Sequence, residues 1–233
     1  MPLLPPNPAL PDLLEIQPTK DGSYTIYSNH YSASFHSIFG ARTESEWIFL
    51  KYGLRTLAPL APLNVLEIGF GTGMNALITA IYSIKNQAFI NYSTIDKHPL
   101  SDQLASDFIR VSAQSEEEGQ LWSQLHLSSW EHQHSIHPCF RFTKLNLDLV
   151  LDNFNSLQNI DLVYYDAFSP YIQKDMWSLD TVSKVSNVMK TGGTLVTYCV
   201  QGHFRRVLKE LNFKIEKHPG PPGKREILRA IKL

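Results

Sequence analysis

The chain has 233 residues, of which 43% are hydrophobic and 11% aromatic, enough for one large domain with a sizeable core. Its two cysteines, Cys139 and Cys199, lie far apart and predict neither a disulfide framework nor a zinc ribbon. No apolar run is long enough to span a membrane, and the proline-rich start lacks the basic residues of a signal peptide. We therefore expect a cytoplasmic protein with no membrane partner.

The formal net charge of −1 conceals an uneven distribution of charge along the chain. Residues 190–233 contain ten Lys or Arg and three acidic residues, a net charge of +7, whereas residues 1–189 carry a net charge of −8. A basic end on an acidic body is typical of a face that binds a polyanion. Scattered solvated lysines would give the same counts, so both interpretations stay open.

The first quarter of the chain predicts a small extension. Residues 1–20 are expected to be irregular because prolines interrupt helices and strand ladders. Residues 22–28 predict a strand that forms half of a hairpin with residues 32–39. Residues 43–54 predict a helix that begins with a capping pair, Thr43 and Glu46. We expect an N-terminal extension at 1–55 and a main domain at 56–233.

From residue 64 onward, apolar strands alternate with helical patterns. Strands are predicted at 64–70, 89–96, within 140–153, at 160–168 and 192–199, and a closing hairpin at 213–218 and 225–233. Helices are predicted at 73–84, 175–190 and 203–211, and polar helices and loops between 99 and 138. This order predicts an α/β fold with a mostly parallel, seven-stranded sheet. Ligands of such sheets bind beyond the carboxyl ends of the strands.

Residues 65–75, VLEIGFGTGMN, run from a buried strand into a loop with glycines at alternate positions, which permits positive φ angles and close approach to a ligand. The loop has no Gly-Lys-Ser/Thr sequence, which excludes a P-loop for phosphates. Met74 stands where a dinucleotide motif requires its third glycine. The G-x-G-x-G spacing after Glu67 resembles motif I of the class I S-adenosylmethionine (SAM) methyltransferases, and the fold is expected to be Rossmann-like accordingly.

The chemistry of SAM agrees with this resemblance. SAM carries no phosphate, so the loop needs no basic side chain, and its N–H groups can meet the SAM carboxylate. Asp96, at the end of the next strand, is expected to accept hydrogen bonds from the ribose hydroxyls. Asp152 and Asn153, taken as the end of the third strand, are expected to meet the adenine amino group. The predicted cofactor residues are Glu67, Gly69, Phe70, Gly71, Thr72, Gly73, Asn75, Asp96, Lys97, Asp152, Asn153 and Asp166. Each acid has a plainer alternative role as a helix cap or a solvated turn.

Longer motifs downstream are more specific. The sequence contains D-x-F-x-P at 166–170, D-M-W at 175–177, G-G-T-L at 192–195, F-R-R-V-L at 204–208 in place of the family's F-x-R-R-x-L, and G-x-x-G-K-R-E at 220–226. These motifs, together with residues 35–50, resemble the methyltransferase domain of the bifunctional tRNA 5-methylaminomethyl-2-thiouridine biosynthesis family. The similarity covers nearly all of the chain after residue 25. The sequence contains no FAD-dependent oxidoreductase half, so the resemblance implies a stand-alone methyltransferase acting on the 5-aminomethyl group of a (2-thio)uridine at the tRNA wobble position.

The resemblance also implies residue roles. Asp166 is the catalytic candidate, expected to orient the acceptor amine and to stabilise the positive charge that grows on nitrogen; its alternative role is to cap the following turn. Ser37 and Glu44 match the family on the substrate side. Phe168, Pro170 and Trp177 are expected to wall the pocket and stack on the wobble base. The candidates for contacts with phosphates of the anticodon stem-loop are Arg205, Arg206, Lys224 and Arg225, of which the adjacent Arg205 and Arg206 cannot both face inward.

Other interpretations stay open. His132, His134, His137 and Cys139 have the chemistry of metal ligands, but methyl transfer needs no metal, and we expect a surface excursion without a metal ion. A SAM-type transferase acting on a small amine, like the aminopropyltransferases, is one alternative function. A non-catalytic RNA-binding protein with a vestigial loop is the other. We expect a monomer.

Overall fold

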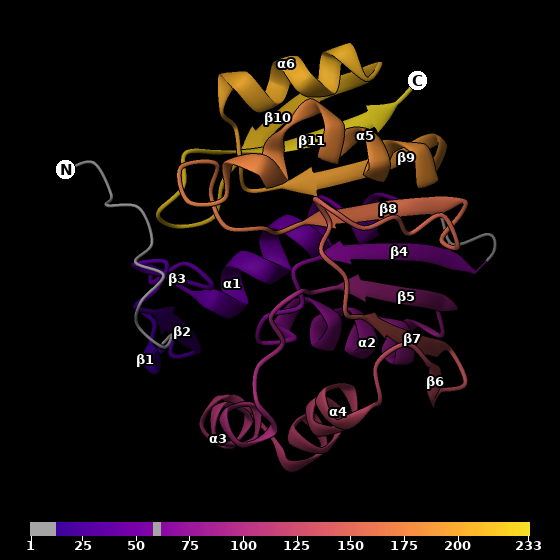
Figure 1. Ribbon diagram of the computed structural model, residues 1–233. Helices are drawn as coiled ribbons and strands as arrows, with labels where there is room; N and C mark the ends of the chain where they lie inside the picture. The colour runs from indigo at the N-terminus through magenta and orange to yellow at the C-terminus, as the bar shows by residue number, and fades with distance from the viewer. Residues whose placement is uncertain (1–12, 58–61) are drawn as a thin grey trace.

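The computed structural model describes residues 13–57 and 62–233, and its centre is one large β-sheet (Figure 1). This sheet has eight strands in the order β10-β11-β9-β8-β4-β5-β7-β6. The strands are β4 (Leu63–Ile68), β5 (Ile90–Ile95), β6 (Gln133–His137), β7 (Phe140–Leu145), β8 (Ile160–Tyr165), β9 (Met189–Thr197), β10 (Phe213–Pro219) and β11 (Glu226–Lys232). The pairs within β9-β8-β4-β5-β7 are parallel, and the pairs at both edges are antiparallel. The predicted α/β fold is confirmed.

Helices cover both faces of this sheet and create two apolar cores. One core packs α2 (Met74–Asn86), α3 (Asp102–Ser112) and α4 (Glu116–Leu127) on one face, with Tyr92 and Tyr164 projecting from the sheet. The other packs α5 (Leu179–Val188) and α6 (Gly202–Glu210) on the opposite face. The central strand β8 is buried at all six positions, as expected for a parallel strand that is covered on both sides.

A second, three-stranded antiparallel sheet precedes the main one. It contains β1 (Leu14–Pro18), β2 (Tyr24–Ser28) and β3 (Ala33–Ser34), and α1 (Ala41–Ser45) follows it. In Figure 1 this sheet lies on the side toward which the arrowheads of β4, β5 and β9 point. The N-terminal segment therefore lies beyond the carboxyl ends of the parallel strands, where a ligand is expected. The division of the chain at residues 55 and 56 stays a prediction.

Four local predictions were wrong. Residues 14–18 form β1 rather than an irregular lead, while residues 1–12 lie outside the described part of the chain. Residues 133–137 form β6, an eighth strand, because they pair antiparallel with β7. The predicted helix at 43–54 is instead α1, a π-helix η1 (Glu46–Lys51) and a 3-10 helix η2 (Leu54–Thr56). Thr43 caps nothing, since its N–H and hydroxyl both donate to Asp21.

The remaining elements agree with the sequence patterns. The helix predicted at 175–190 begins with a 3-10 turn, η3 (Lys174–Trp177), before α5. Serine side chains cap three helices: Ser101 accepts from the Leu104 N–H, Ser115 from the Glu118 N–H and Ser178 from the Thr181 N–H. No helix of the described residues is both long and apolar enough to cross a membrane.

Candidate active site

The glycine loop connects β4 to α2 and faces a large cavity. Gly69, Gly71 and Gly73 have φ angles of 91°, 51° and 74°, all in the left-handed region that favours glycine. A Cβ atom at Gly69 would lie 3.2 Å from the backbone oxygen of Asp166, so the loop and the end of β8 approach closely. The alternating glycines thus allow a tight loop that leaves the carboxyl edge of the sheet open to a ligand.

The cavity has a volume of about 1170 Å³ and is enclosed by the carboxyl ends of the strands and by the N-terminal segment. Its apolar wall includes Ile68, Ile95, Leu147, Leu149 and Val150. Its polar lining includes Ser37, Glu44, Asp96, Asp148, Asp166 and Lys224. Of the predicted cofactor residues, Gly69, Phe70, Gly71, Asp96, Lys97 and Asp166 line this cavity. One cavity therefore joins the glycine loop to Asp166.

Asp96 stands directly after β5, as the sequence predicted. Its Oδ2 accepts a hydrogen bond from the N–H of Gly71 at 2.9 Å, and its Oδ1 accepts one from the N–H of His98 at 2.8 Å. These bonds hold the carboxylate against the glycine loop, while each oxygen keeps a further lone pair for a ligand. The next residue, Lys97, is exposed and pairs through Nζ with Asp148 Oδ2 at 2.7 Å.

Glu67 lies inside the protein and does not line the cavity. Its side chain is fully buried, and neither carboxyl oxygen has a hydrogen-bond partner among the described residues. Burial raises the pKa of the Glu67 carboxyl well above its usual range, and the charge of Asp166 raises it further. Glu67 is therefore a buried carboxyl behind the loop with a raised pKa, and its direct contact with the cofactor stays a prediction that this position does not favour.

Thr72 and Asn75 support the loop from inside the protein. The carbonyl oxygen of Thr72 accepts hydrogen bonds from Trp122 Nε1 and His126 Nε2, both at 2.8 Å, and its hydroxyl contacts His36 Nε2 at 2.9 Å. Burial lowers the pKa of His126 to about 4, so its ring is neutral at pH 7. The buried Asn75 donates from Nδ2 to Asp166 Oδ2 at 2.9 Å. Thr72 and Asn75, both predicted cofactor residues, thus hold neighbouring side chains in place through hydrogen bonds: His36, Trp122, His126 and Asp166.

Asp166 follows β8 directly and lines the same cavity as Asp96. Its backbone N–H donates to the oxygen of Ile68, which continues the sheet by one more bond. Burial raises the pKa of the Asp166 carboxyl well above its usual range, and the nearby charge of Glu44 raises it further. The positive charge of Lys224 acts in the opposite direction. A carboxyl with a raised pKa is a better proton acceptor than an ordinary aspartate.

Glu44 and Lys224 form an ion pair inside the cavity, an arrangement that the sequence did not predict. Lys224 Nζ contacts Glu44 Oε1, and Glu44 Oε2 accepts a hydrogen bond from the N–H of Ser37 at 2.7 Å. Lys224 comes from the loop between β10 and β11 and lies over the Tyr198 ring, 4.9 Å from its centroid. The prediction that Lys224 grips phosphates from a solvated loop therefore has no support in its position, because this ammonium points into the site.

Asp166, Glu44 and Lys224 together form what we call the acceptor end of the cavity. Aromatic side chains line the same cavity. Phe168 lies 4.7 Å from Tyr31 and 5.3 Å from Phe35, measured between ring centroids, and all three line the cavity. Pro170 is next to this wall but does not line it. The prediction that Trp177 walls the pocket was wrong. Trp177 is fully buried in the core against Tyr165 and Phe204, and its Nε1 donates to the oxygen of Phe168.

Asp152 and Asn153 do not stand at the end of the third parallel strand. That strand, β7, ends at Leu145, seven residues earlier, and neither residue lines the cavity. Asp152 Oδ2 instead accepts a hydrogen bond from the N–H of Asp148, closing a turn. The predicted adenine contact assumed that Asp152 and Asn153 end the third strand, and this assumption was wrong. Leu147 to Leu151 occupy the expected place at the cavity wall, and the chain offers backbone groups and apolar side chains there.

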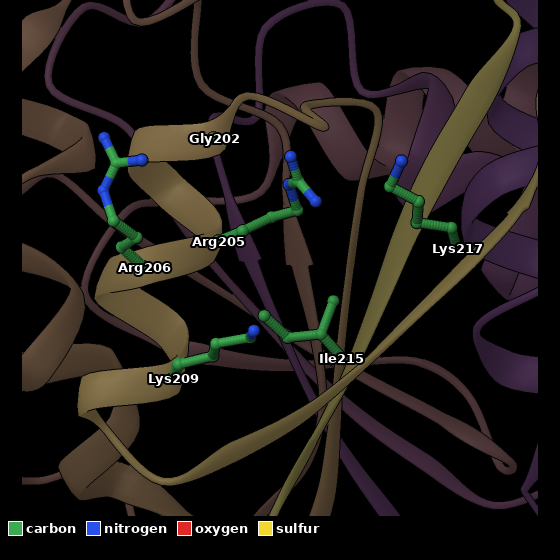
Figure 2. A pocket seen from close by; sticks show the side chains of 6 residues that line it. All are labelled: Gly202, Arg205, Arg206, Lys209, Ile215 and Lys217. Carbon is green, nitrogen blue, oxygen red and sulfur yellow. The ribbon is translucent and has the colours of Figure 1, made fainter.

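A basic groove lies between α6 and β10. It has a volume of about 350 Å³ and is lined by Gly202, Arg205, Arg206, Lys209, Ile215 and Lys217. In Figure 2, Arg205 and Lys209 point from the helix toward β10, whereas Arg206 points away from β10. The Nε of Arg205 is buried without a hydrogen-bond partner among the described residues. Arg225 is exposed on the loop after β10.

The histidine-rich segment belongs to the edge hairpin of β6 and β7. His134 Nε2 contacts the hydroxyl of Ser129 at 3.0 Å, and His137 Nδ1 accepts from the N–H of Cys139 at 3.2 Å. Within residues 13–57 and 62–233, no group of three or more His, Cys, Asp or Glu side chains is arranged to hold a metal ion.

The residues of the cavity fit SAM. At Gly71 the positive φ of 51° favours glycine, and a Cβ there would make a tight contact of 3.1 Å with the Phe35 ring, so the backbone itself faces the cavity. Asp96 presents oxygens for a ribose diol, and the apolar wall from Leu147 to Val150 suits a purine ring. Among the lining residues, His36, Phe35 and Tyr198 were missed, because no motif in the sequence marks them.

Comparison with known proteins agrees with this geometry. A family model described as "S-adenosyl-L-methionine-dependent methyltransferase" matches residues 115–233, just over half of the chain. A "tRNA 5-methylaminomethyl-2-thiouridine biosynthesis bifunctional protein MnmC" from Paracidovorax citrulli is 28% identical over 88% of this chain and 34% of its own length. The protein of the same description from Leptospira borgpetersenii is 32% identical over 72% of this chain and 26% of its own length. The chain thus spans about a third of the length of the curated relatives it matches.

A solved structure has the same fold. MNMC2 from Aquifex aeolicus superposes with a TM-score of 0.79 at 24% identity, covering 97% of this chain and 72% of its own. The superposition includes the N-terminal segment that encloses the cavity, because it extends over almost all of the chain. With a matching family model, a class I fold and a cavity that fits SAM, the chain belongs to the S-adenosyl-L-methionine-dependent methyltransferases.

Proposed function

We propose that this chain is a tRNA N-methyltransferase that converts the 5-aminomethyl group of a (2-thio)uridine at the wobble position to 5-methylaminomethyl. The observation that carries this proposal is the composition of the cavity's acceptor end. Asp166 and Glu44 line the same cavity as the aromatic side chains of Tyr31, Phe35 and Phe168, which contact one another. Carboxylates suit a basic amine, and aromatic rings suit the flat face of a nucleobase.

The relatives support the identity of the acceptor. The two proteins described above are named for 5-methylaminomethyl-2-thiouridine biosynthesis in tRNA, and they align with 88% and 72% of this chain. The aligned part is 34% and 26% of their own length, so their whole activity does not transfer to this chain. The proposal is accordingly limited to the methylation step.

The chain's own residues account for the transfer. When bound, SAM supplies a methyl carbon attached to a positively charged sulfur, and the C–S electron pair stays on sulfur as that carbon passes to the acceptor nitrogen. Asp166, fixed by the amide of Asn75, orients the acceptor nitrogen and stabilises the positive charge that forms on it.

The basic groove supports a polyanionic substrate. Four cationic side chains, Arg205, Arg206, Lys209 and Lys217, line one depression of the surface. Because α6 begins just after β9, its first turn lies at the same edge of the sheet as the cavity. An RNA backbone that crosses this edge would bring phosphates to the groove and a base to the cavity.

The proposal is tested by transfer of a tritiated methyl group from SAM to tRNA. We expect transfer to tRNA that carries 5-aminomethyluridine and none to the same tRNA without the modification. Transfer to small amines with no preference for tRNA would instead establish the small-amine alternative. No transfer together with no heat of SAM binding in calorimetry would leave the chain as a non-catalytic RNA-binding protein.

In cells, the same proposal predicts a defined change in tRNA. Mass spectrometry of tRNA nucleosides from a host that lacks this protein should show the 5-aminomethyl nucleoside accumulating at the expense of the 5-methylaminomethyl nucleoside. Unchanged nucleosides would contradict the proposal.

A further inference from the structure

The ion pair of Glu44 and Lys224 occupies an unusual place, the acceptor end of the cavity. The Glu44 side chain is 7% exposed and that of Lys224 is 26% exposed, so both charges are largely removed from solvent. Neither belongs to an apolar core of the protein. Burying a charge is costly unless it is paired, so each of the two residues compensates the other.

The surrounding groups leave few charges to consider. Asp166, His36 and Tyr198 face the pair from the segments after β8, β3 and β9. Burial lowers the pKa of His36 and raises the pKa of Tyr198, so both side chains are neutral at pH 7. Glu67 and Cys199 lie behind them, and burial raises the pKa of each. The groups that a bound amine meets are therefore the charged pair of Glu44 and Lys224 and the carboxyl of Asp166, whose pKa is raised by burial and lowered by Lys224.

An acceptor amine needs an unprotonated nitrogen, because the lone pair forms the new bond. Alkylammonium groups resemble the lysine side chain, whose pKa in water is about 10.4. Two carboxylates beside such a group would stabilise its protonated form and raise that pKa further. A neighbouring ammonium has the opposite effect, and a second cation is a known way to obtain a nucleophilic amine. The acceptor end thus needs a positive charge to offset Glu44.

We propose that Lys224 is a positioning residue that neutralises Glu44, so that an amine bound beside Asp166 releases its proton before it is methylated. This inference rests on the proposed function, which supplies the amine. The proton passes to solvent water, the nitrogen lone pair forms the N–C bond, and the product leaves as a protonated secondary amine. Glu44 remains an acceptor for the amine's N–H groups, because its Oε2 is oriented by the Ser37 N–H.

The test is the pH dependence of the single-turnover rate at saturating SAM and saturating 5-aminomethyluridine tRNA, where the acid limb reports the pKa of the bound amine. Lys224→Gln should move this limb to higher pH by roughly one unit, and Glu44→Gln should move it to lower pH by roughly one unit. The double variant restores neutrality and should return the limb close to that of the wild-type protein. Lys224→Arg keeps the charge and should rescue the profile.

Two controls separate this role from a structural one. Lys85→Gln removes a positive charge at the end of α2, outside the cavity, and should leave the limb unmoved. SAM affinity from calorimetry should be the same in all variants, since the pair lies at the acceptor end. If Lys224→Gln does not fold, Glu44→Gln still tests the proposal, because the acid limb of its pH profile must move to lower pH.

The outcomes are distinct. A limb that stays in place, or moves in the same direction for both single variants, overturns the role of Lys224 while wild-type methylation still supports the proposed function. A wild-type protein that binds SAM but never methylates the aminomethylated tRNA overturns both.

Discussion

Asn75 donates a hydrogen bond from Nδ2 to Oδ2 of Asp166 at 2.9 Å, which joins the first turn of α2 to the end of β8. The helix that follows the glycine loop therefore fixes the carboxyl at the acceptor end. The amide adds no charge of its own, but its hydrogen bond favours the ionised carboxyl and lowers the pKa of Asp166, as Lys224 does, whereas burial and Glu44 raise it. The side chain of Asn75 thus links the helix after the glycine loop to the carboxyl of Asp166.

Asp166→Asn keeps the shape of the side chain but removes its charge. If Asp166 stabilises positive charge on the acceptor nitrogen, turnover should fall by on the order of 10²-fold or more, with little change in SAM affinity. Asp161→Asn is the matched control: this aspartate begins the same strand, pairs with Lys190, and lies outside the cavity. Wild-type turnover in Asp166→Asn would remove Asp166 from the catalytic role.

Gly71→Asp should abolish SAM binding while leaving the fold intact. The new Cβ would meet the Phe35 ring at 3.1 Å, and the new carboxylate would face both Asp96 and the carboxylate of SAM. Gly192→Asp controls for backbone strain, because Gly192 also has a left-handed φ, of 80°, with no atom near its Cβ position. Calorimetry that gave Gly71→Asp the wild-type affinity would place the cofactor elsewhere.

Glu67→Gln should stabilise the protein at alkaline pH. Glu67 has a raised pKa in the folded protein, whereas the unfolded chain ionises it near 4.3. The unfolded state thus loses the proton first, and wild-type stability falls as the pH rises above that value. Glutamine cannot ionise, so the variant should gain about 1.4 kcal/mol or more at pH 8, the free energy of one pKa unit, and much less at pH 4. Urea unfolding of the variant and the wild-type protein at pH 8 and pH 4 measures the gain in the free energy of unfolding. An equal gain at the two pH values would show that Glu67 is ionised in the folded protein.

Arg205→Gln combined with Lys209→Gln tests the basic groove. Both side chains point toward β10 and line the groove, so their loss should lower tRNA affinity. Neither belongs to the apolar core, so SAM affinity and melting temperature should stay unchanged. Each lost phosphate contact should flatten the slope of log affinity against log salt by roughly 0.7 to 0.9. The control removes two cations elsewhere, Lys85→Gln and Arg110→Gln. A salt slope equal to that of the wild-type protein would exclude the groove as an RNA contact.

Local patterns were enough to predict that the glycine loop and Asp96 lie at the carboxyl edge of the sheet. The glycine spacing and Asp96 each depend on a few neighbouring residues, and the strands that carry them are continuous apolar runs. The alternation of strands and helices was also enough for the α/β fold, since it restricts the possible sheet orders. The edge strand β6 was missed because its residues, QHSIH, are polar and are ordered only by pairing with β7.

The acceptor end was harder to predict. Asp152 and Asn153 were misplaced because the sequence from 140 to 153 stays apolar at alternate positions after the strand has ended at Leu145. Trp177 was assigned to the pocket from a motif, yet its indole fills the core beneath Phe168. Lys224 was taken as a solvated charge because its Gly/Pro-rich loop has few apolar neighbours. Its partner, Glu44, is 180 positions away, and no local pattern reveals such a pairing.

That separation also sets the order in which the molecule can be completed during synthesis. Lys224 leaves the ribosome long after the glycine loop and Asp96, because it follows Asp96 by 128 positions. Until Lys224 emerges, Glu44 lacks the ion pair of the folded protein, and closing the intervening loop costs entropy that only the assembled sheet offsets. A nascent chain therefore acquires the surface that we assign to the cofactor before it can form the ion pair of Glu44 and Lys224.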